Sequence, residues 1–215
     1  MLVPLLIAFL SAAPPATGAG DAGAALALLR RLEERNARTS DLVARFTQSY
    51  RSGMLGREVT ESGTVAIKRP GRMRWEYEQP EPKLFVSDGR RFYFYVPAEK
   101  QVIVSDEDEQ RSLAARLLSG RGGIGDEFSV SLDTPREEGV LRLKLVPRRE
   151  QPDVERAWVE LEPSGRVREI ELDDVQGNRT RFRFEGLREN TGLKDELFRF
   201  EVPKGVEVIR GRSDP

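Results

Sequence analysis

The chain after residue 40 alternates apolar and polar residues in many short stretches, and this pattern constrains the fold more than any other feature. Alternation with period 2 is typical of β-strands that bury one face. Turn signals separate the stretches, at Pro70-Gly71, Asp88-Gly89, Pro163-Ser164-Gly165 and Gly177-Asn178. About ten to twelve antiparallel strands in one domain predict a barrel or a strongly curved sheet.

The alternating residues define the face that each predicted strand buries. They are Leu42, Ala44 and Phe46; Val65 and Ile67; Met73, Trp75 and Tyr77; Leu84 and Val86; Phe92 and Phe94; Val102 and Val104; Phe128 and Val130; Leu141, Leu143 and Leu145; Ala157, Val159 and Leu161; Ile170 and Leu172; Phe182 and Phe184; and Phe198, Phe200 and Val202. On the strand that contains Phe182 and Phe184, the residues of the opposite face are Arg179, Arg181 and Arg183. These arginines indicate that this face of the strand is exposed to solvent.

Two stretches have helical periodicity instead. Residues 24–36 predict an amphipathic helix, which Asp21 is placed to cap. Leu113, Leu117 and Leu118 have the spacing i, i+4, i+5, which predicts one or two helical turns with an apolar stripe, followed by several glycines. This short helix either covers one mouth of the sheet as a lid or fills the core as an ordinary connection, and the spacing leaves both open.

The chain has no Cys and no His among its 215 residues, which excludes thiolate and imidazole metal ligands, Cys nucleophiles and His-based triads. The acidic run at 106–109 and the pair Asp173-Asp174 are read as solvated charge. The glycines at 120–123 lack the Lys-Ser/Thr ending of a phosphate loop. We therefore expect no enzyme, no metal and no cofactor. A net charge of −1 gives no reason to expect nucleic acid as a partner.

Residues 1–19 have the apolar stretch and the small residues of a secretory signal, although no Lys or Arg precedes the apolar stretch. The apolar run is shorter than the ~20 residues that span a bilayer. We expect cleavage near Ala19 and a single domain over residues 20–215. Without Cys, an exported chain carries no lipidated N-terminal cysteine.

The most aromatic strands suggest a large apolar surface on one side of the sheet. Met73, Trp75 and Tyr77 alternate on one strand, and Phe92 and Phe94 on a nearby one. A curved single-layer sheet either fills its interior with such side chains or keeps a cavity. Composition alone does not decide between a packed core and a cavity.

Several segments in order along the chain resemble the LolA family of periplasmic outer-membrane lipoprotein carrier proteins. The segments are residues 46–48 (Phe-Thr-Gln), 63–80 (from Gly-Thr-Val-Ala-Ile-Lys-Arg-Pro-Gly to Gln-Pro), 84–89, 94–97, 174–178 and 200–209. Together they extend over roughly residues 24–209. The resemblance implies an incomplete, unclosed antiparallel β-barrel, mainly β with short helices, whose apolar cavity is closed by an α-helical lid.

The resemblance also implies the partners and some site residues. Such carriers accept acylated lipoproteins from an inner-membrane ABC-type release complex and deliver them to an outer-membrane receptor of the same fold, in the periplasm and as monomers. Arg69 matches the family arginine that bonds to lid carbonyls, and Met73 and Trp75 match cavity-wall positions. The predicted cavity residues are Phe46, Val65, Ile67, Met73, Trp75, Tyr77, Phe92 and Phe94, and the predicted lid residues are Arg69, Leu113, Leu117 and Leu118.

A carrier or sensor of the same fold that serves another lipid or a glycolipid is the alternative. The outer-membrane receptor itself is disfavoured, because receptors of this fold normally carry a lipidated Cys.

Overall fold

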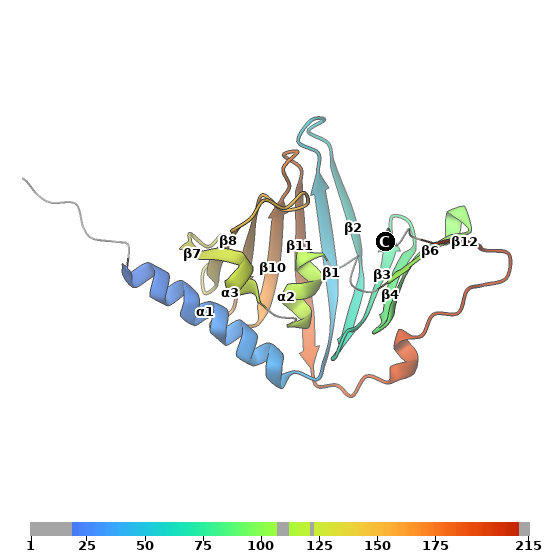
Figure 1. Cartoon of the computed structure of the whole chain (residues 1–215), viewed down its shortest axis with the longest axis horizontal. Helices are drawn as coiled ribbons and strands as arrows, with labels where there is room; N and C mark the ends of the chain where they lie inside the picture. The colour runs from blue at the N-terminus through green and yellow to red at the C-terminus, as the bar shows by residue number, and fades with distance from the viewer. Residues whose placement is uncertain (1–18, 107–111, 121–122, 211–215) are drawn as a thin grey trace, which may run out of the picture.

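A computed structural model describes residues 19–106, 112–120 and 123–210, and they form one curved sheet with helices on its concave side (Figure 1). The helices are α1 (Ala19–Arg38), α2 (Leu113–Ser119) and α3 (Ile124–Glu127), with 3₁₀ turns η1 (Pro97–Glu99) and η3 (Asp195–Phe198). The strands are β1 (Asp41–Arg51), β2 (Glu58–Lys68), β3 (Arg72–Gln79), β4 (Lys83–Asp88), β5 (Arg91–Val96), β6 (Gln101–Asp106), β7 (Phe128–Asp133), β8 (Leu141–Pro147), β9 (Arg156–Leu161), β10 (Val167–Asp173), β11 (Arg179–Glu189) and β12 (Glu207–Arg210).

The predicted signal peptide, except for its last residue, lies outside the described residues. The helix after it, α1, is longer than predicted at both ends. Asp21 therefore lies in the first helical turn and is not the N-cap, because the helix already begins at Ala19. None of the helices in the described ranges is long and apolar enough to span a bilayer.

The strand order is β12-β6-β5-β4-β3-β2-β1-β11-β10-β9-β8-β7. Neighbouring strands are antiparallel, except that β12 pairs in parallel with β6. Within the part of the chain that the structure describes, the edge strands β12 and β7 do not pair with each other, so the sheet is not closed. The prediction of a mainly β, incomplete barrel with short helices is confirmed, with parallel β12 as a departure from the expected antiparallel arrangement.

The half of the sheet from β7 to β10 has a solid aliphatic core. Leu143 and Leu145 on β8 are fully buried, and α1 contacts β7 and β8. Leu28, Leu29 and Leu32 of α1 are buried in the same cluster. Since each buried aliphatic side chain contributes about 1.5–3 kcal/mol, this half of the molecule forms the stable base on which the rest is built.

The pairing of β2 with β3 shifts register at Gly63 of β2. Gly63 lies opposite Phe46 on one side and Tyr77 on the other. The two rings meet across the glycine with centroids 4.8 Å apart. A Cβ atom on Gly63 would lie 1.9 Å from the carbonyl oxygen of Glu76, so only glycine allows this close approach of β2 and β3.

The convex face of β8 to β11 carries a buried ion-pair network. Glu171 on β10 accepts hydrogen bonds from Arg136, Arg142 and Arg181. Burial alone would raise the pKa of Glu171, but Arg181 and Arg136 outweigh it and hold the pKa below its ordinary value. The alternating arginines of β11 are therefore partners in a network and not simply a solvated face.

The chain after β11 crosses the convex face and adds β12 to the sheet. η3 contacts β3 and β4, and Lys68 binds Asp195 at 2.6 Å. Phe200 packs its ring against Tyr93 and Tyr95. The strand predicted over residues 198–202 is wrong, because these apolar residues cover the convex face instead of pairing, and the last strand is β12.

Asp41, the first residue of β1, anchors the start of this crossing. Its carboxylate accepts hydrogen bonds from the Thr191 amide (2.7 Å), the Thr191 hydroxyl (2.8 Å) and the Gly192 amide (3.0 Å). Burial opposes ionisation, but these donors more than offset it and lower the pKa of Asp41.

We expect Gly63→Ala to lower the free energy of unfolding by about 2–4 kcal/mol, because the methyl group collides with backbone and forces β2 and β3 apart. Gly23→Ala in α1 is the control. A Cβ there meets nothing within 4 Å, so this change is expected to stabilise the helix by about 0.5–1 kcal/mol. Urea unfolding measures both, and an unchanged midpoint for Gly63→Ala would contradict the close approach of β2 and β3 at this residue.

We expect Asp41→Asn to destabilise the fold by about 1–3 kcal/mol at pH 7, because the charged acceptor of the crossing is lost. A lowered folded-state pKa means that the contribution is fully present above the unfolded pKa, about 4, and is lost as the pH falls through the folded value. The difference between wild type and variant should therefore shrink below about pH 4. Unfolding curves from pH 7 to pH 2 test this; a constant difference would argue against a charge effect.

Candidate functional site

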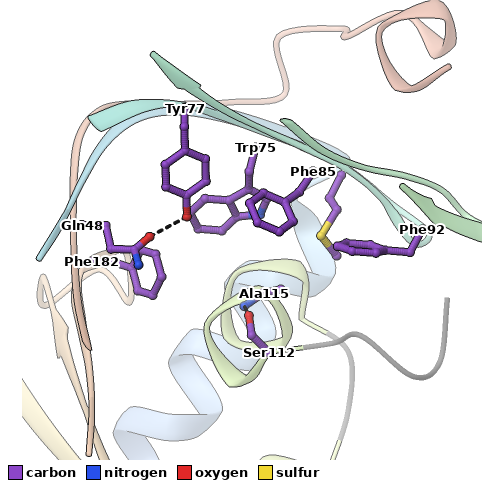
Figure 2. Close-up of a pocket in the computed structure, with 9 residues that line it drawn as sticks. Gln48, Trp75, Tyr77, Phe85, Phe92, Ser112, Ala115 and Phe182 are labelled. Atoms are coloured by element: carbon purple, nitrogen blue, oxygen red, sulfur yellow. Dashed lines mark hydrogen bonds between the residues drawn. The ribbon is translucent and has the colours of Figure 1, made fainter. Parts of the chain in front are cut away.

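An apolar cavity of about 270 Å³ lies between the concave face of the sheet and α2. Figure 2 shows the rings of Trp75, Tyr77 and Phe85 projecting from the strands toward α2. The lining residues are Gln48, Met73, Trp75, Tyr77, Phe85, Phe92 and Phe182 from the sheet, and Ser112 and Ala115 from the helix side.

The alternation of β3 and its register with β4 build the aromatic wall. Trp75 is paired with Phe85 across the two strands, so both rings stand on the concave face. Trp75 makes edge contacts with Phe46 and Phe182, with centroids 5.0 and 5.4 Å apart. Each such pair contributes about 0.5–1.5 kcal/mol beyond its buried area, so the rings are held in fixed orientations.

Four of the predicted cavity residues line the cavity: Met73, Trp75, Tyr77 and Phe92. Phe46, Val65 and Ile67 lie on the same face but are buried in the core beside the lining residues. Phe94 is half-buried and stacks on Phe85, with centroids 4.3 Å apart.

The prediction omitted Phe85, Phe182, Gln48, Ser112 and Ala115. Phe182 was visible as an alternating aromatic on its strand. Phe85 was hidden, because the apolar neighbours Leu84 and Val86 suggested the opposite face of β4.

The wall has one hydrogen-bonded polar pair, Tyr77 and Gln48. The Tyr77 hydroxyl donates to Gln48 Oε1 at 2.5 Å. Burial raises the pKa of Tyr77 far above its ordinary value, and Glu61 adds to the effect, so the hydroxyl stays protonated. Lys83 lies over the Tyr77 ring, 4.4 Å from its centroid, and binds Glu61 at 2.6 Å.

The predicted lid helix is α2, and its three leucines all face inward. Leu113, Leu117 and Leu118 are buried in the main core cluster. Ser112 caps the helix by accepting a hydrogen bond from the Ala115 amide at 3.3 Å, and Gly120, with φ 70°, ends it. The acidic run before α2 lies outside the described residues from 107 onward. Within the described ranges, no group of acidic side chains is arranged to hold a metal.

Arg69, in the turn after β2, binds the C-terminal end of α2. Its Nε donates to the Ser119 carbonyl oxygen at 2.6 Å, and Nη2 donates to the Leu118 carbonyl oxygen at 2.8 Å. Nη1 donates to the carbonyl oxygen of Thr39, just after α1. Burial lowers the pKa of Arg69 while Glu189 opposes the shift, and an arginine remains protonated at neutral pH.

Asn36 of α1 joins Arg69 and α2. Its Nδ2 donates to the Leu117 carbonyl oxygen at 3.0 Å, and its Oδ1 accepts from Arg69 Nη2 at 3.0 Å. A Cβ atom on Gly120 would lie 2.6 Å from the Asn36 Cβ, so the helix end sits directly against this side chain. Arg69 and Asn36 together satisfy three successive carbonyl groups at the end of α2, and we call this pair the latch.

A second ion pair ties α2 to α3. Arg116 binds Glu127 at 2.5 Å, and this hydrogen bond is the main reason that the pKa of Glu127 lies below its ordinary value. Since both residues are partly exposed, the pair positions the helices more than it stabilises them.

Comparisons with known proteins agree on one family. The family described as outer membrane lipoprotein carrier protein LolA matches residues 37–201. An outer-membrane lipoprotein carrier protein of Nitrosospira multiformis is 36% identical over 151 residues, 70% of this chain and 72% of the relative. One of Azotobacter vinelandii is 34% identical over 186 residues, 85% and 87% of the two chains. The crystal structure of an uncharacterized conserved protein from Thermus thermophilus has a TM-score of 0.54 at 17% identity, covering 87% of this chain and 99% of that one, which shows a shared fold.

We expect Asn36→Ala to speed hydrogen exchange of the α2 amides about tenfold, because the Leu117 carbonyl and Arg69 each lose a partner. Mass spectrometry of a peptide covering 113–119 measures this. Arg38→Ala on the same helix is the matched control, since Arg38 makes only an exposed pair with Glu34 and should leave α2 unchanged. Equal rates of α2 amide exchange in Asn36→Ala and wild type would show that Asn36 is not part of the latch.

Proposed function

The chain belongs to the LolA family of outer-membrane lipoprotein carrier proteins, and we propose that it takes up the acyl chains of lipoproteins between the concave sheet and α2. The observation that carries this proposal is an aromatic cavity closed by a short helix whose end is held by Arg69. Met73, Trp75, Tyr77 and Phe92 would contact the cargo.

The hydrophobic effect explains why such a carrier needs a covered cavity. Burying a methylene group is worth about 0.8 kcal/mol, so one long acyl chain left in water costs on the order of 10 kcal/mol. A chain that crosses an aqueous space with its cargo must cover most of that surface. It must also release the cargo, so the cover has to move.

α2 is suited to be a movable cover because a helix of its length is not stable by itself. It has seven residues, and isolated helices shorter than about 12–15 residues are marginal in water. Its structure therefore depends on buried leucines and on the latch. When acyl chains enter, they take over the apolar contacts of the leucines, and the cost of moving the helix is largely offset.

The cavity of the closed form is small for its cargo. Its volume of about 270 Å³ is below the roughly 300–1,000 Å³ of typical pockets for drug-sized ligands. Loading should therefore displace α2 and open the space now held by Leu113, Leu117 and Leu118. In this account the closed form is the unloaded one.

We place this carrier in the periplasm as a monomer, with residues 1–19 serving as its signal peptide. An ABC-type release complex of the inner membrane would supply the lipoprotein and an outer-membrane receptor would accept it. The glycine-rich stretch of the chain lacks the Lys-Ser/Thr ending of a phosphate loop, so the energy for loading would come from the release complex and not from the carrier.

We expect Arg69→Leu to loosen α2 and uncouple loading from transfer. The variant loses charge-assisted hydrogen bonds to carbonyls of α2, so exchange of α2 amides should rise about 10- to 100-fold and an apolar fluorescent dye should enter the cavity more readily. Hand-over of an acylated lipoprotein to its receptor should slow.

Arg69→Lys is the matched control, because it keeps the charge but cannot donate to several carbonyls at once. An intermediate effect is expected. If Arg69→Leu hands on lipoproteins at the wild-type rate, the latch role of Arg69 is wrong. Mass spectrometry of lipid that copurifies with the wild type separates lipoprotein cargo from a glycolipid or another lipid.

A further inference from the structure

The apolar surface of the concave face continues beyond the cavity to the edge of the sheet. The pairing aligns Trp75 with Phe85 and Phe85 with Phe94. It then aligns Phe94 with Ile103 on β6, and Ile103 with Ile209 on β12. Paired residues point to the same face, so one apolar row runs from the cavity wall to β12.

Exposure increases along this row. Trp75 is 6% exposed, whereas Ile103 is 37% and Ile209 is 38% exposed. Phe85 and Phe94 lie between them and are half-buried. The apolar row is therefore continuous from the buried cavity wall to the edge of the sheet, and its last residues are exposed to solvent. We call Phe94, Ile103 and Ile209 the edge row.

The opposite face of the same strands is occupied. Val102 of β6 lies on this face, is fully buried, and pairs with Val208 on one side and Tyr95 on the other. The ring of Tyr95 packs against Phe200 of the C-terminal segment. The C-terminal segment thus covers the convex side of β5 and β6. On the convex side of β12, Val208 remains 47% exposed, but it is not continuous with the cavity wall, whereas Ile103 and Ile209 are.

The dimensions fit one acyl chain. Four strand spacings of about 4.8 Å separate Trp75 from Ile209, which gives a row of roughly 19 Å. One leaflet of a bilayer, with its chains extended, is about 15 Å thick. The closed cavity, by contrast, holds only about 270 Å³. A chain that starts in the cavity has room to continue along the row to its end.

The shape of the row also favours a chain over a protein surface. On β6, the concave-side neighbours of Ile103 are Gln101 and Ser105, both polar and uncharged. Gln101 is bonded to Glu207 of β12 at 3.2 Å. On β6 and β12 the open apolar surface is therefore one residue wide, far from the ~800 Å² per partner of a stable protein interface.

We propose that the edge row is an extension of the lipid-binding surface, along which the distal part of a long acyl chain lies between the cavity and β12. This inference rests on the proposed function and names its ligand more closely as a long acyl chain, whose distal part reaches beyond the residues that line the cavity. β12 then has a direct role, because its Ile209 ends the row.

The test compares two adjacent residues of β12 that point to opposite faces. Ile209→Ser, alone and with Ile103→Ser, removes the edge row, whereas Val208→Ser changes an equally exposed valine, 47% exposed, on the other face. The probes are synthetic diacyl lipopeptides with 16-carbon or 8-carbon chains, and binding is followed by the fluorescence of Trp75 and Trp158. Unfolding curves establish that each variant is folded.

We expect the double variant to bind the 16-carbon probe about tenfold more weakly than wild type, and the 8-carbon probe within about twofold. Val208→Ser should bind both normally. Wild-type affinity of the double variant for the 16-carbon probe would overturn the edge row. The proposal would also be overturned if the double variant bound both probes normally but no longer bound the receptor, because the face would then bind a protein partner. If wild type binds neither probe, the proposed function itself fails.

A second measurement does not depend on any variant. A photoreactive group at the end of a 16-carbon chain should crosslink to wild-type residues of β6 or β12, and mass spectrometry locates the adduct. Adducts confined to α2 and β3 would overturn the proposal. An 8-carbon chain carrying the same group is the control and should label only the cavity.

Discussion

The position of α2 against the sheet depends on the hydrogen bonds that Arg69 donates to the end of this helix. A seven-residue helix has too few internal hydrogen bonds to persist alone, and its last carbonyl groups need donors. Arg69 supplies two of them and Asn36 a third. Because the same guanidinium reaches the carbonyl of Thr39, it joins α2 to the junction of α1 and β1.

The two halves of the sheet differ in how they fill their concave side. On β8 and β9, branched aliphatic side chains such as Leu143 and Val159 are fully buried, in the same core cluster as the leucines of α1. On β3 to β5 the corresponding residues are aromatic. Rigid rings fixed edge to face leave gaps that flexible aliphatic chains would fill. α2 lies at the border between the two halves, so a movement of α2 as proposed would open the aromatic half and leave the aliphatic half intact.

Sequence patterns predicted the strands and the concave side of β3 well, because Met73, Trp75 and Tyr77 alternate without interruption. On β4 they gave Leu84 and Val86 as the buried face, and Val86 is fully buried, but that face is the convex one and the concave residue is Phe85. The reason is that β4 has apolar partners on both faces, since the C-terminal segment covers the convex one. Such long-range covering is a tertiary effect that period-2 alternation cannot detect.

The same covering segment explains why the carrier can be open at one edge without exposing a bare sheet. Phe198 is buried on the convex side, and Phe200 packs on the tyrosines of β5, so this face of β3 to β5 is shielded. β12 then pairs with β6 and hides the backbone groups of that strand. The concave row that ends at Ile209 stays exposed at its outer end, with Ile103 and Ile209 37% and 38% exposed. The C-terminal segment therefore covers the convex face of β3 to β5. Through β12 it also adds one more strand to the concave face.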